Sequence, residues 1–216
     1  MRGVTLIMDG VSVHTGEDLD LVQELKTIGN PTIQSYHVQV PGRNGLLNLT
    51  KGLTGNVAYN NRTIQLQYFA SGTREELIEL LNTINRYHGE TIQIVDDDTP
   101  DYYYEGECSV SFALKPNYVT ISLALDAQPF ALRRELTTLY VELSSTSQSV
   151  VIHDTDAPVI PIVEVTGSAV IVKDNISYTL SKGSYEITDL ILNKGTNIFN
   201  VSGSGSVTFV YREAKI

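Results

Sequence analysis

The densest group of side chains that could do chemistry is an acidic run near the middle of the chain, DDDTPD, which holds Asp96, Asp97, Asp98 and Asp101. Carboxylate oxygens gathered in this way are the ligands that calcium prefers in proteins. A calcium loop of the EF-hand type also needs a glycine at its sixth position and a more distant glutamate. No glycine stands at the sixth position counted from Asp96, Asp97 or Asp98, and Pro100 interrupts the stretch. We therefore predict a solvated turn here and no metal site.

Cys108 is the single cysteine, so the chain cannot form an intrachain disulfide. It lies in the alternating run 107–114, which predicts a half-buried strand residue, and no pattern of His or Asn supports a nucleophilic role. The four histidines lie too far apart for metal-ligand spacing; they are His14, His37, His88 and His153.

Phosphate-binding and hydrolase motifs are also missing from the sequence. Gly203 and Gly205 alternate with serines between two predicted strands, and we interpret them as a hairpin rather than a phosphate loop. We expect no catalytic residue, no metal and no cofactor. Tyr102, Tyr103 and Tyr104 could stack on sugars or bases, but tyrosines that begin a strand usually pack within a sheet, which is the interpretation we favour.

Composition limits the classes of partner. The chain has 216 residues, 42% of them hydrophobic and 19% charged, with a net charge of −10. Residues 1–127 carry 8 basic and 16 acidic side chains (net −8), and residues 128–216 carry 7 and 9 (net −2). This balance argues against sequence-specific nucleic-acid binding and against attraction to an anionic membrane. The apolar start is too short for a signal peptide and no membrane-spanning run is present, so we expect a soluble chain made in a cytoplasm.

The elements that must position any site begin with one helix, predicted at about 73–88 in TREELIELLNTINRYHG. Thr73 and Glu76 have the spacing of a capping box, and Gly89 can end the helix in a left-handed conformation. A single apolar stripe follows from the three- and four-residue steps between Leu77, Leu80, Leu81 and Ile84. We expect this stripe to cover a sheet.

The rest of residues 1–127 reads as strands. A hairpin is predicted at 3–14 through Asp9-Gly10, and a second hairpin with a polar tip at 36–50. The stretch 18–28 fits a helix or a strand, and we favour a strand. Helices do not alternate with strands, which indicates an antiparallel α+β unit; its further strands are predicted at 62–70, 91–95, 102–116 and 117–126.

Residues 127–135 mark a predicted domain boundary, where Pro129 and the pair Arg133-Arg134 precede a change in composition. Short strands separated by turn residues follow, which is typical of a β-sandwich. The predicted domains are therefore 1–127 and 128–216, and the fold class is mainly β. The strands of the second domain are predicted at 136–143, 149–153, 160–165, 169–173, 176–180, 184–187, 190–193, 196–202 and 206–212.

Two motifs resemble a known family. The hairpin HVQVPGRNGLLNLT resembles the VPGRDG-x-LDLT signature of the distal tail proteins of bacteriophages and prophages with long non-contractile tails, with Asn44 and Asn48 in place of aspartates. The chain end GSVTFVYREAKI is similar to the REG-x-L close of phage tail components, with Ala214 for glycine and Ile216 for leucine. The order of elements in this chain also fits that family.

The resemblance implies a structural protein and not an enzyme. It implies an N-terminal domain similar to tail-tube proteins, which assembles as a hexameric ring or as two stacked rings, and a C-terminal galectin-like sandwich. Such a ring joins the tail-tube protein to tail-tip, baseplate or receptor-binding proteins. The expected location is the virion tail tip, after assembly in the bacterial cytoplasm.

The polar-tipped hairpin is the candidate subunit interface, because an exposed hairpin can complete a neighbouring sheet. Its candidate contact residues are Val40, Arg43, Asn44, Leu47 and Asn48. An ordinary exposed hairpin is an equally good interpretation of the pattern. Two other functions stay open: a tail-tube or other baseplate component of the same fold, and a carbohydrate-binding module that uses the sandwich and Tyr102–Tyr104.

Overall fold

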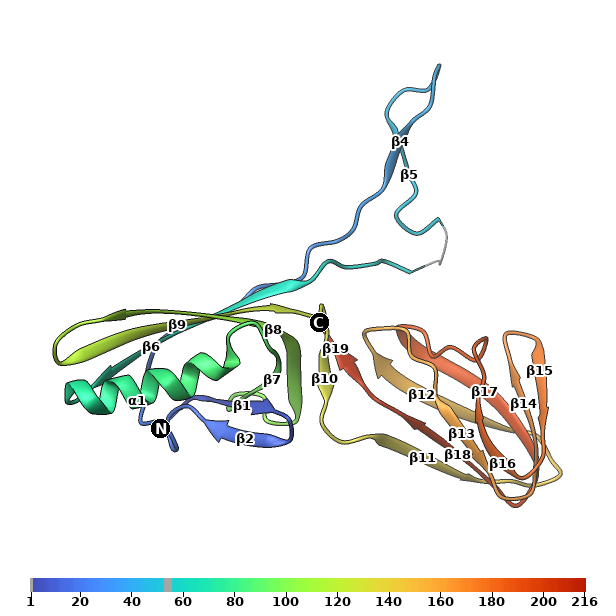
Figure 1. Ribbon diagram of the computed structural model, residues 1–216. Helices are drawn as coiled ribbons and strands as arrows, with labels where there is room; N and C mark the ends of the chain where they lie inside the picture. Colours follow the sequence, from blue (N-terminus) through green and yellow to red (C-terminus); the bar gives the residue numbers. More distant parts are fainter. Residues whose placement is uncertain (1, 53–55) are drawn as a thin grey trace. The chain divides into compact units, whose positions relative to one another are not determined.

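The computed structural model describes residues 2–52 and 56–216 (Figure 1). The chain is mainly β, as predicted, and it forms two compact units. Unit 1 comprises residues 1–131 with Ile216, and unit 2 comprises residues 132–215. The division falls between Ala131 and Leu132, inside the stretch 127–135 where the composition changes.

Unit 1 is built on an antiparallel sheet in the order β2-β1-β7-β8-β9-β6-β3. The 3–14 hairpin is confirmed, and its turn residues Asp9 and Gly10 both have positive φ, at 51° and 78°. The ambiguous stretch 18–28 forms a strand from Val22 onward, as favoured. The strands are β1 (Val4–Met8), β2 (Val11–His14), β3 (Val22–Ile28), β6 (Arg62–Ser71), β7 (Thr91–Asp96), β8 (Tyr102–Leu114) and β9 (Tyr118–Ala127).

The helix α1 (Arg74–Ile84) begins as predicted, because Thr73 and Glu76 form a reciprocal capping box. It is shorter than predicted: its last turn tightens into the 3₁₀ helix η1 (Asn85–Tyr87), and Gly89 beyond it has φ 81°. The apolar stripe is confirmed, with Leu80 only partly buried. Its three buried members join the core that the sheet provides; they are Leu77, Leu81 and Ile84.

An ion cluster shows that the sheet of unit 1 curves back on itself. The Lys26 ammonium in β3 donates to Asp96 Oδ1 of β7 at 2.7 Å and to Asp98 Oδ2 at 2.6 Å. Strands β8, β9 and β6 separate these two strands along the sheet. The prediction of a solvated turn is therefore wrong for Asp96, which is buried. Its burial is possible because Lys26 supplies the compensating charge.

Replacing Lys26 with methionine is expected to lower the free energy of unfolding by about 3 kcal/mol, because it leaves Asp96 buried without a counter-charge. The pKa of Asp98 is held below its usual value by the hydrogen bond from Lys26 and by the positive charges of Lys26 and Arg2. Burial alone would lower the pKa of Lys26, but its hydrogen bonds and the charges of both aspartates raise it overall. The cluster therefore stabilises at neutral pH.

That stabilisation is lost as the pH falls through the lowered pKa of Asp98, and again as the pH rises through the raised pKa of Lys26. Urea unfolding across pH, with Lys26→Met beside the exposed Lys115→Met, measures both effects. Equal stability of the two variants at neutral pH would contradict the proposed role of the cluster.

Unit 2 is a β-sandwich, as predicted. Its two four-stranded antiparallel sheets enclose one core, in which the rings of Phe199 and Phe209 lie 5.3 Å apart. One sheet has the order β11 (Thr137–Glu142), β18 (Ser206–Tyr211), β13 (Ile162–Val165) and β16 (Gly183–Glu186). The other has the order β12 (Gln148–Thr155), β17 (Gly195–Ser204), β14 (Ser168–Lys173) and β15 (Ile176–Leu180).

Two predictions in this half are wrong. Residues 190–193 form no strand, because Leu192 makes only an isolated bridge to Val159 and is buried with Leu190 in the sandwich core. The Gly203–Gly205 segment is no hairpin, since β17 and β18 belong to different sheets and the chain crosses between them there. Two short paired strands were not predicted; they are β10 (Ala131–Arg133) and β19 (Ala214–Lys215).

Candidate functional site

The segment between β3 and β6, residues 29–61, is here called the arm. It contains the predicted hairpin, formed by β4 (His37–Gln39) and β5 (Leu46–Asn48) (Figure 1). Backbone hydrogen bonds of 2.8–3.2 Å show that the outgoing and returning segments of the arm continue the β3–β6 pair beyond its end. They run from the N–H of Gly29 to Thr63 O, of Gln34 to Ala58 O, and of Asn60 to Thr32 O.

The hairpin has one apolar face and one mostly polar face. Val38 lies opposite Leu47 in the register, and the Leu49 N–H donates to Tyr36 O at 2.8 Å. Because side chains alternate along a strand, five apolar residues share one face. We call this the apolar hairpin face; it consists of Tyr36, Val38, Val40, Leu47 and Leu49. The opposite face carries His37, Gln39, Leu46 and Asn48.

The apolar hairpin face covers no core. Tyr36 is 63% exposed and Leu49 is 38% exposed. Among the described residues of the arm, none belongs to the core of unit 1 or to the core of unit 2. An amphipathic hairpin whose apolar face stays in solvent is the pattern expected of a surface that another molecule covers.

The tip of the hairpin turns through two glycines with positive φ, Gly42 at 81° and Gly45 at 77°. Asn48 Oδ1 accepts from the Thr50 N–H at 2.9 Å, so this amide shapes the hairpin locally. The predicted contact residues therefore lie in three different parts of the hairpin. Val40 and Leu47 lie on the apolar hairpin face, whereas Asn48 faces the other way and Arg43 and Asn44 lie in the tip turn.

Sequence reasoning missed Tyr36, Val38 and Leu49 as contact candidates, although the alternation with Val40 and Leu47 could have identified them. The motif drew attention to residues 40–48 instead. The apolar hairpin face extends beyond residues 40–48 toward the base of the hairpin.

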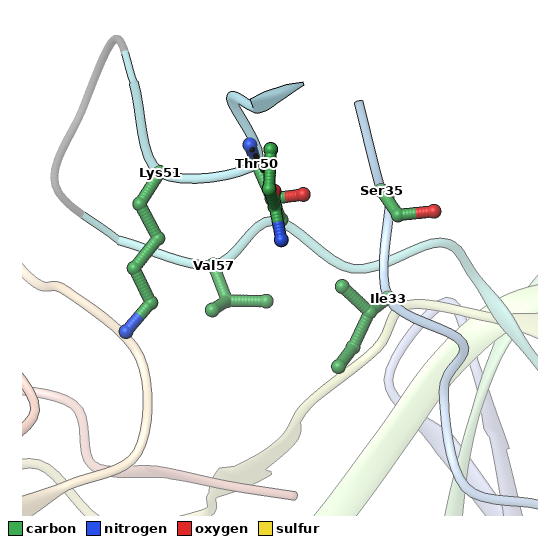
Figure 2. A pocket seen from close by; sticks show the side chains of 6 residues that line it. Ile33, Ser35, Thr50, Lys51 and Val57 are labelled. Atoms are coloured by element: carbon green, nitrogen blue, oxygen red, sulfur yellow. Dashed lines mark hydrogen bonds between the residues drawn. The ribbon is translucent and has the colours of Figure 1, made fainter. Parts of the chain in front are cut away.

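Two hollows flank the base of the hairpin. One of about 590 Å³ is lined by Ile33, Ser35, Asn48, Thr50, Lys51 and Val57. Figure 2 shows Ile33 and Val57 extending to the same side of the ribbon, with the Lys51 side chain beside Val57. A second of about 490 Å³ includes Tyr36 and Leu49 in its lining. Lys51 is the only charged group among the described linings of both, which favours contact with another surface over catalysis.

The arm differs in charge from the rest of unit 1. Residues 29–61 contain Arg43 and Lys51 and no Asp or Glu. The other residues of 1–127 contain six Lys or Arg and sixteen Asp or Glu, a net of −10. Within the described part of the chain, no ion pair joins Arg43 or Lys51 to a carboxylate. The arm is thus a cationic, partly apolar extension of an acidic body.

The other sequence candidates are not brought together. Among the residues that the structure describes, no group of three or more His, Cys, Asp or Glu could hold a metal. The His14 Nε2 lies 3.2 Å from Asp97 Oδ2. Tyr102, Tyr103 and Tyr104 are partly buried, and the Arg62 guanidinium lies 5.1 Å from the centre of the Tyr104 ring. No helix in the described ranges is long and apolar enough to cross a membrane.

Cys108 is fully buried in the core of unit 1, deeper than the half-buried position predicted. Burial raises the pKa of its thiol to about 11. The reactive form is the thiolate, so Cys108 is expected to resist a thiol reagent in the folded protein and to react rapidly once denatured. Spectroscopic titration of the free thiol with and without urea tests this. Rapid labelling of folded protein would mean that unit 1 opens readily.

A comparison with solved structures finds a protein whose fold matches this chain over its full length. No protein-family model matches the sequence, and neither does any curated protein. The fold is similar to that of the Dit protein (gp 19.1) of phage SPP1, described as a paradigm of the hub adsorption apparatus in phages that infect Gram-positive bacteria. The TM-score is 0.67 at 13% identity, and the match covers 99% of each chain. The expected mainly β fold and its likeness to a phage hub protein are thus confirmed.

Proposed function

We propose that this chain is a structural protein of a bacteriophage tail, a hub at the distal tip that forms a hexameric ring. The observation that carries the proposal is the fold match to a phage hub protein over 99% of both chains, which accounts for both units rather than one. The two sequence motifs point to the same family independently of the fold. In this role, the ring joins the tail tube to baseplate or receptor-binding proteins.

The arm supplies a physical reason for self-assembly. Its apolar hairpin face is exposed in a single copy of the chain, so an assembly in which a neighbour covers it is favoured by the removal of apolar surface from water. Contacts between two different surfaces of identical subunits close into a ring when the rotation between them permits. The arm therefore acts as the subunit connector.

The test is the mass of the purified protein by light scattering, followed by negative-stain imaging. A hexamer with a central hole is the expected result, and a dodecamer would indicate two stacked rings. Long tubes would instead identify a tail-tube protein of the same fold. A chain that stays monomeric both alone and with the tail-tube and tail-tip proteins of its phage would refute the proposal.

Carbohydrate binding is the weaker alternative. The three tyrosines that prompted it are partly buried, and Tyr104 already packs against the Arg62 guanidinium. Stacking on a sugar needs a free aromatic face. Glycan-array binding by the whole chain, lost when Tyr102 and Tyr103 are replaced by serine, would favour this function over the ring.

A further inference from the structure

A second exposed apolar surface lies on unit 1, at one corner of the sheet. Val22 is the register partner of Phe69, and the Phe69 and Tyr118 rings stack at 5.5 Å. Leu25 pairs with Gln67, on the same face of the sheet as Phe69. This face is the one opposite the buried side chains of β6. We call the surface the corner patch; it consists of Val22, Leu25, Phe69 and Tyr118.

The corner patch is open to solvent, with Val22 48% exposed and Leu25 44% exposed. It is also flanked in sequence by acidic residues, because Asp18, Asp20 and Glu24 surround Val22 and are themselves exposed. It therefore combines an apolar centre with a negative margin. The hairpin combines an apolar face with the positive charges of the arm, Arg43 and Lys51.

The arm is directed away from the corner patch of its own chain. Val22 and Phe69 lie at one end of the β3–β6 pair, and the arm leaves from the other end, beyond Ile28 and Arg62. The ladder of backbone hydrogen bonds continues outward from there. The length of β3 alone places about 20 Å between Val22 and the base of the arm. The hairpin can meet such a patch only on another copy.

We propose that the apolar hairpin face of one copy packs on the corner patch of the next, with Arg43 and Lys51 near the acidic residues around Val22. The occupant of the patch is a second copy of this chain, because both complementary surfaces belong to the same polypeptide. The contact is head-to-tail, so each copy gives one hairpin and receives one, which is the geometry that a ring requires. This inference rests on the proposed function and names the surface on which the arm acts.

Chemical cross-linking between two differently tagged single-cysteine variants tests the contact in the whole protein. One chain carries Tyr36→Cys on the hairpin and the other Val22→Cys on the patch. Native Cys108 is buried and contributes little background. A short bis-maleimide is expected to join the two tags into a covalent dimer, whereas neither variant alone is joined. The matched control replaces Val22→Cys with Ile78→Cys, on the exposed side of α1 (43% exposed), and is expected to give no product.

A second measurement uses Val22→Ser with Leu25→Ser in one chain, compared with Ile78→Ser. The patch variant is expected to weaken self-association about tenfold or more by sedimentation, and the helix variant to leave it unchanged.

The outcomes separate this inference from the proposed function. Rings that form without the Tyr36–Val22 cross-link and tolerate the patch variant would overturn the inference and leave the hub role intact. A cross-link in open filaments without rings would support the contact and refute the ring. A wild-type chain without self-association or cross-link would overturn the inference, and failure to join other tail proteins would overturn the hub role as well.

Discussion

Replacing Leu49 with serine is expected to weaken self-association of the protein by about 10- to 100-fold, the loss that follows from removing one buried leucine from an interface. Leu49 lies on the apolar hairpin face beside Tyr36 and touches neither core. The variant should therefore fold normally, and its unfolding transition should match that of the wild type. Sedimentation velocity over a range of protein concentrations measures the change in association.

Leu46→Ser is the matched control, because it changes the same residue type in the same hairpin. Leu46 is more exposed than Leu49, at 59%, yet it lies on the opposite face, across from Gln39. If general surface hydrophobicity drove association, Leu46→Ser would have the larger effect. If the apolar hairpin face drives it, only Leu49→Ser weakens it. Equal effects of the two variants would contradict the assignment of faces.

The elements predicted well from the sequence are those whose signals are local. The capping box at Thr73 and Glu76 and the turn at Asp9-Gly10 depend only on residues a few positions apart. Alternation likewise identified β6, β9 and β14, since a strand with one buried face imposes a two-residue period. Each of these needs no knowledge of what lies across the sheet.

The misses depend on partners distant in sequence. Asp96 reads as a solvated loop residue until Lys26, 70 positions earlier, is brought to it by the curvature of the sheet. The Gly203–Gly205 segment has the composition of a hairpin, but strand pairing places β17 and β18 in different sheets. No local pattern records which sheet a strand joins. The crossing was therefore not predictable from residues 203–205 alone.

The candidate site likewise has one part that local sequence signals predict and one part that depends on residues distant in sequence. The alternation of residues 36–40 and 46–49 predicts a hairpin with one apolar face, and in most proteins such a face covers the core of its own domain. The sequence cannot show that the ladder carries this hairpin beyond the end of β3 and β6, where no core exists. The proposed role of the arm rests on two observations. Its apolar hairpin face is not covered by the described residues of its own chain, and the corner patch offers a second apolar surface on which we propose that it packs.

Replacing Phe199 with alanine is expected to lower the stability of unit 2 by about 3–5 kcal/mol, because it leaves a cavity beside Phe209 and both rings are fully buried in the sandwich core. The two cores share no residue, so unit 1 should keep its own stability. Calorimetry should show one transition moved to lower temperature and one unchanged. Leu66→Ala, in the core of unit 1, should lower the stability of unit 1 by about 2–5 kcal/mol and so move the other transition to lower temperature.

Cys108 reports which unit has opened, because it is the single cysteine and lies in the core of unit 1. In the Phe199→Ala variant, its labelling rate should equal that of the wild type at temperatures where unit 2 has already unfolded. In Leu66→Ala it should rise, because labelling of a buried thiol follows the population of the opened unit. Faster labelling in Phe199→Ala would mean that the units unfold as one. The arm and the corner patch would then depend on the sandwich for their stability, and truncation to residues 1–131 would not preserve assembly.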